Sequence, residues 1–136
     1  MIKIKTQEEI KIMAEGGKIL AKIMKELEKK IRPGIKTREL NRLAESLIFK
    51  YGGECSFKKY QGFPACLCAS VNEEIVHAVP SERILKEGDM ISLDLGLKYK
   101  GFHTDMAITV PVGKVSLEAK KLIEVTKKSL EIGVEK

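Results

Sequence analysis

The sequence predicts an α+β protein in which helices cover one face of an antiparallel sheet. Apolar residues recur at three- and four-residue steps in two N-terminal segments and one C-terminal segment, which is typical of amphipathic helices. Between these segments lie short runs with strand character, bounded by Gly and Pro. A length of 136 residues fits a single domain spanning residues 1–136.

The first two helices carry recognisable start and stop signals. Thr6 and Glu9 form a capping box, and the apolar pattern that follows runs over residues 10–31 to a Pro-Gly stop. Thr37 is the predicted N-cap of the second helix, whose pattern ends at a pair of glycines at residues 52–53.

Strands are predicted at residues 65–71, 89–96 and 102–110. The third helix begins at its predicted N-cap, Ser116, and its pattern runs to Lys136 without a stop signal, so we expect the chain to be truncated.

The last two predicted strands bring two carboxylates together. The chain has only three Asp residues, and two of them, Asp94 and Asp105, lie in the facing parts of these strands. A loop over residues 98–101 places Leu93 opposite Met106 and Asp94 opposite Asp105. A one-residue slip would move the apolar residues to the wrong face, so this register is the prediction.

Facing carboxylates repel each other, and something must offset that repulsion. A proton shared by Asp94 and Asp105 would do so, as in a general acid/base dyad. A neighbouring Lys98 or Lys100 would also do so. The third alternative is metal, because paired cations in hydrolases lie about 3.5–4 Å apart and two carboxylates can bind them.

The two histidines have different surroundings. His77 lies in an apolar loop that ends at Pro80, which favours a rigid side chain able to donate to a carbonyl or to move a proton. An ordinary surface histidine is the alternative. His103 lies on the Asp105 side of its strand, and we expect it to pack beside the site without binding the reacting atoms.

We expect an intracellular protein, because the N-terminal residues lack the features of a signal peptide. The three cysteines, Cys55, Cys66 and Cys68, are an odd number, and their spacings are unlike those of a disulfide framework. We therefore predict reduced, buried thiols; the alternative is that Cys66 and Cys68 form half of a metal site. No signal peptide or membrane-spanning run is present in the sequence. The net charge of +6 lies entirely in residues 1–50, which indicates either a solvated helix face or a surface for an anionic partner such as RNA.

Several ordered motifs resemble the N-terminal half of a methionine aminopeptidase of the bacterial type I form. The matching segments are residues 60–64 (Tyr-Gln-Gly-Phe-Pro), 70–77 (ending in His77), 86–89, 94–96 and 101–105. The resemblance spans essentially the whole chain. It implies one half of the "pita-bread" fold, a cytoplasmic location, and removal of the initiator methionine from nascent proteins or peptides.

The resemblance also implies roles for particular residues. Asp94 and Asp105 would be ligands of two divalent ions (Co, Mn, Fe or Zn), and His77 would be catalytic and contact the substrate near the scissile amide. Tyr60, Phe63 and Cys68 would line the pocket for the methionine side chain, because sulfur packs well against aromatic rings.

The family's other metal ligands, one His and two Glu, belong to a second half that this sequence does not include. We therefore predict weak metal binding, little hydrolysis by these residues alone, and self-association through surface left uncovered. Two alternatives stay open. One is a non-catalytic module of the same fold that binds RNA, the ribosome or a protein through its basic helices; the other is a related peptidase that cleaves before proline.

Overall fold

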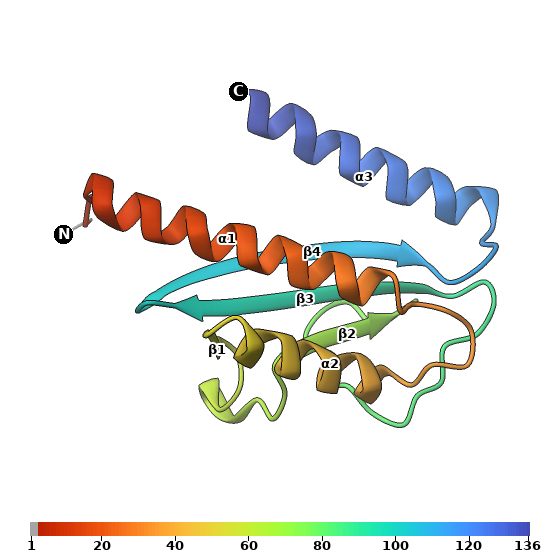
Figure 1. The fold of residues 1–136 in the computed structure, drawn as a ribbon. Helices are drawn as coiled ribbons and strands as arrows, with labels where there is room; N and C mark the ends of the chain where they lie inside the picture. The colour runs from red at the N-terminus through yellow and green to blue at the C-terminus, as the bar shows by residue number, and fades with distance from the viewer. Residues whose placement is uncertain (1–2) are drawn as a thin grey trace.

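The computed structural model describes residues 3–136 and confirms the predicted α+β architecture. Two helices, α1 (Gln7–Glu28) and α2 (Thr37–Lys50), lie side by side on one face of a four-stranded antiparallel sheet (Figure 1). The core lies between this helical layer and the sheet. Its fully buried side chains include Leu20, Ile23 and Leu27 of α1, Leu40 and Ile48 of α2, and Ile91, Leu93, Leu95 and Leu97 of the sheet.

The capping box of α1 forms as predicted. The Glu9 amide donates to the Thr6 hydroxyl over 3.3 Å, and the Thr6 amide donates to the Glu9 carboxylate over 2.7 Å. The helix ends at Glu28, three residues before the predicted end, because the amides of Lys30 and Ile31 turn to carbonyls three residues back. This tighter turn leads into the segment before proline, where helical geometry is disfavoured.

The predicted N-cap of α2 is wrong by one residue. Lys36 is the N-cap, and its amide donates to the Glu39 carboxylate over 2.9 Å. Thr37 is already in the helix, and its buried hydroxyl accepts from the Ser81 amide over 2.8 Å and donates to the Ser81 carbonyl over 3.2 Å. The sequence pattern assigned the Thr37 hydroxyl to the helix cap, but it bonds to Ser81 instead, which is distant in the sequence.

The sheet is built around strand β3 (Met90–Tyr99). Along one edge it pairs with β4 (Phe102–Pro111), and along the other edge it pairs first with β2 (Leu67–Val71) and then with the short β1 (Glu54–Cys55). The strands β2, β3 and β4 match the three predicted strands, whereas β1 was not predicted.

The register of the β3–β4 hairpin differs from the prediction by two residues. Tyr99 pairs with Phe102, so the loop is the two-residue turn Lys100–Gly101, with φ values of 48° and 85°. Positive φ at both positions is the signature of a type I′ turn, whose twist suits adjoining strands. Asp94 therefore lies opposite Ala107, and the predicted direct pairing of the two aspartates is wrong.

Helix α3 (Leu117–Glu135) begins as predicted at Ser116, whose hydroxyl accepts from the Ala119 amide over 3.1 Å. It follows β4 and carries the C-terminus back toward the end of the molecule where the chain begins (Figure 1). None of its residues is buried. Among residues 3–136, no helix combines the length and the apolar character that crossing a bilayer requires.

Candidate active site

Asp94 and Asp105 lie on the same face of the sheet, the face opposite α1 and α2. On β3 the residues flanking Asp94 are buried in the core, and on β4 Asp105 belongs to the exposed set. A shift of two residues keeps side chains on the same face, so the corrected register makes the two aspartates diagonal neighbours across adjacent strands.

The two carboxylates influence each other electrostatically. Burial raises the pKa of Asp94 above its ordinary value, and the charge of Asp105 raises it further. His77 acts in the opposite direction and lowers it. These effects fall off with distance, so all three side chains share one neighbourhood although they come from β3, β4 and the loop before β3.

Neutralisation of the aspartates by lysine, one of the three alternatives from the sequence, is wrong. The Lys98 ammonium lies 3.3 Å from a Glu54 carboxylate oxygen, and the Lys100 ammonium lies 3.1 Å from a Glu15 oxygen. Both lysines are therefore engaged away from Asp94.

The carboxylate of Asp94 fits a divalent cation. Its Oδ1 atom is buried and has no hydrogen-bond partner among residues 3–136. A buried polar atom without a partner costs free energy, which coordination to a cation would recover. The neighbouring Asp105 supplies a second oxygen donor, and oxygen donors suit hard and borderline divalent ions.

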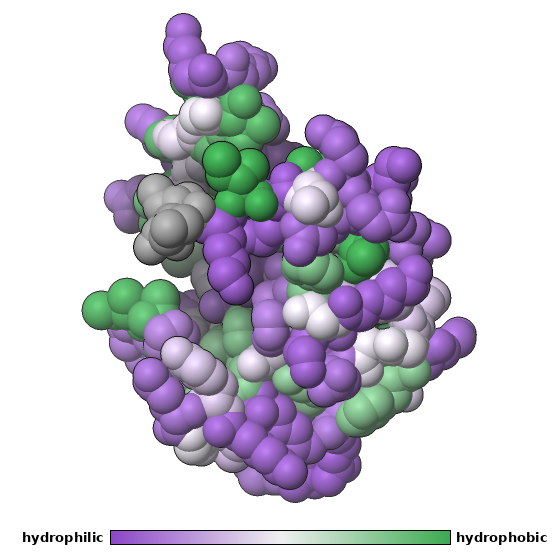
Figure 2. Space-filling model, turned by 90° about the vertical axis from the view of Figure 1, so that its left-hand side faces the viewer, coloured by the Kyte–Doolittle hydropathy of each residue, from purple (hydrophilic) through white to green (hydrophobic). Residues whose placement is uncertain are grey.

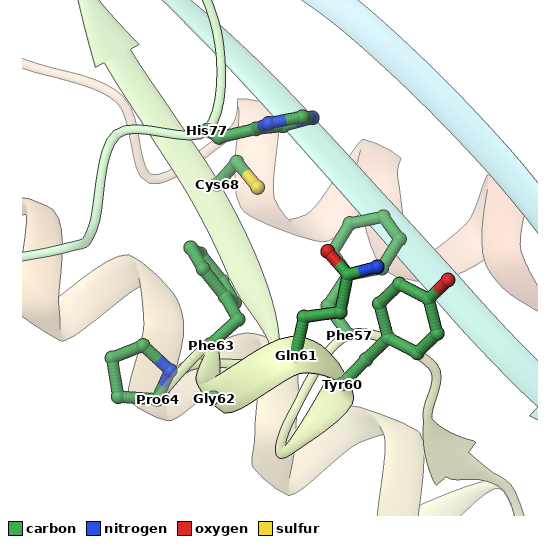
Figure 3. A pocket seen from close by; sticks show the side chains of 8 residues that line it. All are labelled: Phe57, Tyr60, Gln61, Gly62, Phe63, Pro64, Cys68 and His77. Carbon is green, nitrogen blue, oxygen red and sulfur yellow. The ribbon is translucent and has the colours of Figure 1, made fainter.

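A cavity of about 510 Å³ opens beside these carboxylates. Its walls come from the loop between β1 and β2, from β2 itself and from the loop after β2. The lining residues are Phe57, Tyr60, Gln61, Gly62, Phe63, Pro64, Cys68 and His77 (Figure 3). The structure thus brings together all four of the predicted substrate-contacting residues, and it adds Phe57, Gln61 and Pro64.

Residues 56–65, here called the pocket loop, supply most of this wall. Figure 3 shows Tyr60 and Gln61 rising from the short 3-10 helix Tyr60–Gly62, with Phe63, Cys68 and His77 on the other side of the cavity. Seen from the hairpin end, the surface is largely hydrophilic and is recessed on the side facing away from α1 and α2 (Figure 2).

A glycine lets the pocket loop lie against the open face of the sheet. Gly96 pairs with Asp105, and a Cβ atom at position 96 would lie 2.6 Å from the Phe57 ring and 2.7 Å from the Ser56 Cβ. The Ser56 amide donates to the Gly96 carbonyl over 3.1 Å. The sequence places Gly96 in a motif, but this close approach could not be inferred from it.

His77 adopts an unusual backbone conformation. Its φ is 57°, in the left-handed region that costs free energy for residues other than glycine. The next residue is fixed from both sides, because the Ala78 carbonyl accepts from the Ala69 amide over 3.0 Å and the Ala78 amide donates to the Ser70 hydroxyl over 3.4 Å. The imidazole itself is solvent-exposed at the rim of the cavity.

Cys68 presents an uncharged thiol to the cavity. Burial raises its pKa to about 11, and the charges of Asp94 and Asp105 add to that effect. Cys68 pairs in register with Asp94 on the neighbouring strand, so this wall of the cavity lies next to a carboxylate. At neutral pH this side chain is a small, polarisable wall and not a thiolate nucleophile.

The prediction of three reduced thiols is wrong for two of them. Cys55 and Cys66 form a disulfide, and only Cys68 is free and buried as expected. The pairing joins the end of β1 to the residue before β2, and β1 itself was not predicted. The short sequence spacing therefore gave no sign that the two sulfur atoms meet.

His103 lies near Asp105 but bonds elsewhere. Its Nδ1 atom is 2.9 Å from the Ser56 hydroxyl, which links β4 to the start of the pocket loop. It also lines a second hollow of about 380 Å³ together with Asp105, Phe57 and Tyr60. The rings of Phe57 and Tyr60 border both hollows.

Comparison with known proteins places this site in a family. Residues 11–136 match metallopeptidase family M24. The chain is 51% identical over 135 residues to methionine aminopeptidase 1 of Bacillus subtilis, covering 99% of this chain and 54% of that protein.

Solved structures of peptidases resemble this chain in fold. The crystal structure of methionine aminopeptidase from Thermotoga maritima superposes with a TM-score of 0.93 at 39% identity over 96% of this chain and 53% of that one. An Xaa-Pro dipeptidase from Bacillus anthracis gives 0.75 at 30% identity over 87% of this chain and 32% of its own. The chain spans about half the length of the methionine aminopeptidases that it matches. With its predicted half-fold, its shared-face carboxylates and a family match over most of its length, the chain belongs to metallopeptidase family M24.

Proposed function

We propose that residues 1–136 form the methionine-binding half of a methionine aminopeptidase, which removes the initiator methionine from nascent proteins in the cytoplasm. The observation that carries this proposal is the position of the cavity. Cys68 lines it and pairs in register with Asp94, so a side chain held there is adjacent to the carboxylates.

The cavity suits a methionine side chain. Phe57, Tyr60 and Phe63 supply aromatic surface, and Cys68 supplies an uncharged thiol. A thioether gains from contact with aromatic rings and with polarisable sulfur, and it needs no hydrogen bond to be buried. His77 is exposed at the rim of the cavity, and we expect its imidazole to donate to the carbonyl of the bound residue.

Asp94 and Asp105 are the proposed metal ligands of this half. When two divalent ions such as Co, Mn, Fe or Zn are bound, they polarise the substrate carbonyl and lower the pKa of water. Because two carboxylates leave most coordination positions unfilled, tight binding needs donors from outside these residues. In the resembling family those donors are one His and two Glu. We therefore expect residues 1–136 alone to bind metal weakly and to hydrolyse little.

Both alternative functions have less support. A purely binding module has no use for a buried, unpartnered carboxylate oxygen such as Oδ1 of Asp94. Peptidases that act before proline share the fold, but the Bacillus anthracis Xaa-Pro dipeptidase is 30% identical, whereas the Bacillus subtilis methionine aminopeptidase is 51% identical.

We also propose that copies of this chain associate with each other through exposed apolar surface. Helix α3 exposes large apolar side chains, namely Leu117, Leu122, Val125, Leu130, Ile132 and Val134. The metal-facing side of β4 instead carries mostly small or polar residues, such as Asp105 and Thr109. We had expected the exposed apolar surface on the metal-facing wall of the sheet; on β4 this is wrong, and α3 carries exposed apolar side chains instead.

A chimera tests the proposed function. Residues 1–136 are joined to the remaining part of the Bacillus subtilis relative, and methionine release from a Met-Gly peptide is measured with Co²⁺ or Mn²⁺. We expect release by the chimera and little by residues 1–136 alone. Loss of a metal ligand costs at least as much as loss of its supporting partners, so Asp94→Asn in the chimera reduces release by roughly a hundredfold or more. A chimera that folds and cleaves the bond before proline in an Xaa-Pro peptide, but releases no methionine from Met-Gly, would overturn the proposal.

A further inference from the structure

The pocket loop is an excursion from a nearly continuous strand. Cys55 of β1 pairs with Leu97, and Leu67 of β2 pairs with Leu95, on the same edge of β3. The chain leaves this edge after Cys55, forms the wall of the cavity, and returns to the edge at Leu67. The position of that wall therefore depends on what holds the two ends of the excursion together.

The Cys55–Cys66 disulfide closes the excursion at its base. The two Cα atoms lie 5.1 Å apart, and all of residues 56–65 lie between them. Cys66 is fully buried in the core, where it is the fixed end of the bond. Cys55 is only half-buried, so it is the more exposed residue of the pair.

Hydrogen bonds and an ion pair join the base of the pocket loop to the rest of the fold. Near the base, Ser56 bonds to Gly96 and His103, Lys58 forms an ion pair with Glu45, and the Cys66 amide donates to Asn41.

The tip has hydrogen bonds only within the loop, among the residues that the structure describes. The Lys59 amide donates to the Phe63 carbonyl over 2.8 Å, and the Phe63 amide donates to the Tyr60 carbonyl over 2.9 Å. Lys59 and Gln61 also have left-handed φ values of 73° and 47°, which a free loop would relax. The tip therefore relies on the closed base for its order.

We propose that the Cys55–Cys66 bond is a redox-sensitive tether that determines the order of the pocket loop. Oxidised, it holds the aromatic wall of the cavity in place; reduced, it leaves the loop with more conformational freedom and a less preorganised cavity. Its effect on ligand affinity rests on the function proposed above, whereas its effect on loop order does not.

The redox step is thiol–disulfide exchange with a dithiol. A thiolate of the dithiol attacks Sγ of Cys55, the Cys55–Cys66 bond breaks, and Cys66 leaves and takes up a proton. The second thiol of the reductant then displaces Cys55, which is also protonated. Two electrons and two protons pass to the protein, and the dithiol becomes a disulfide.

Amide hydrogen exchange of residues 56–65 tests the tether directly. The full chain is compared before and after treatment with dithiothreitol, and reduction is expected to speed exchange in the loop by roughly ten- to a hundredfold. Both samples contain EDTA, because a Glu45 oxygen lies within 4.8 Å of both cysteine sulfurs and a bound metal could replace the bond as a tether.

The matched control is the double variant Cys55→Ser with Cys66→Ala. Its loop should exchange like that of the reduced protein, and dithiothreitol should change nothing. If the double variant does not fold, the comparison of oxidised with reduced unmodified chain still tests the proposal. Equal rates of amide exchange in the oxidised and reduced chain would overturn the proposal. So would failure of glutathione disulfide to form the Cys55–Cys66 bond, which mass spectrometry after alkylation of free thiols detects.

Binding of L-methionine separates this proposal from the proposed function. If reduction loosens the loop and weakens methionine binding, both are supported. If reduction loosens the loop but methionine binds neither form, the tether stands and the assignment of the cavity fails. If methionine binds equally well to both forms and loop exchange is unchanged, the tether fails and the cavity assignment stands.

Discussion

Asp105 on β4 pairs with Gly96 on β3, and the Ser56–Phe57 end of the pocket loop lies in the space that a side chain at position 96 would occupy. One residue pair thus joins a proposed metal ligand to the wall of the cavity. Only glycine allows the loop to approach the sheet this closely.

Substituting Gly96 with Ala should displace the pocket loop. The added Cβ would lie 2.6 Å from the Phe57 ring, so either the ring or the strand must move. Overpacking of this kind costs about 1–3 kcal/mol in the free energy of unfolding, which urea denaturation measures.

The control is Gly17→Ala in α1, where an added Cβ meets nothing within 4 Å. There we expect a gain of about 0.5–1 kcal/mol, because alanine loses less backbone entropy than glycine in a helix. Equal effects of the two substitutions would show that Gly96 is not sterically required.

Asp94→Asn should stabilise the chain when no metal is present. The half-buried carboxylate lies near Asp105 and has an unpartnered oxygen, so removing its charge is expected to raise the free energy of unfolding by about 1 kcal/mol in EDTA. Mn²⁺ should reduce this difference in stability between the two proteins, because a ligand that binds only the folded state stabilises it.

Thermal unfolding of both proteins in EDTA and in millimolar Mn²⁺ checks this. The melting temperature of the unmodified chain should rise with Mn²⁺, and that of Asp94→Asn should not. A parallel rise in both proteins would mean that Mn²⁺ binds elsewhere.

The stability of the chain should depend on pH through Asp89. Burial acts to raise the pKa of Asp89, but hydrogen bonds from the Lys86 amide (2.8 Å) and the Asn72 amide group (2.9 Å) outweigh it, and the pKa is lowered. The folded state therefore favours the carboxylate. The resulting stabilisation is present above the unfolded-state pKa and is lost as the pH falls through the folded-state pKa.

Asp89→Asn should remove this dependence. At pH 6 the variant should be less stable than the unmodified chain by about 1 kcal/mol, and near pH 3 the difference should shrink. Urea denaturation at both pH values measures it, and a difference that stays constant with pH would contradict the assignment.

Helix α3 should drive concentration-dependent association. Leu122 is 60% exposed and Val125 is 54% exposed, one turn apart on the same helix. Replacing both with Gln should lower the apparent mass in sedimentation experiments toward that of a monomer, because apolar surface is no longer available for burial. Lys121→Gln is the control, and an equal effect from it would assign the association to charge.

The elements of the fold were predictable because their signals are local. The Thr6–Glu9 capping box and the apolar pattern of α1 need no tertiary information. The hairpin register was not recoverable in the same way, because side chains alternate with a period of two. A shift of two residues leaves Asp94 on the same face, so the alternation supports both registers equally.

The turn would have decided the register, but its sequence signal is weak. Lys100 is not one of the residues that usually precede Gly in a type I′ turn. The pocket loop and the Cys55–Cys66 pairing were beyond sequence reasoning for another reason. Both depend on β1 and β2 sharing an edge of β3, which only the assembled sheet reveals.

Because β1 and β2 lie end to end along one edge of β3, the chain between them is an insertion into an otherwise uninterrupted border. The insertion can change in length and composition without interrupting β3 or β4, the strands that carry Asp94 and Asp105. Under the proposed function, the segment that recognises the substrate side chain is therefore distinct from the two strands that carry the metal ligands, so either one can be altered separately.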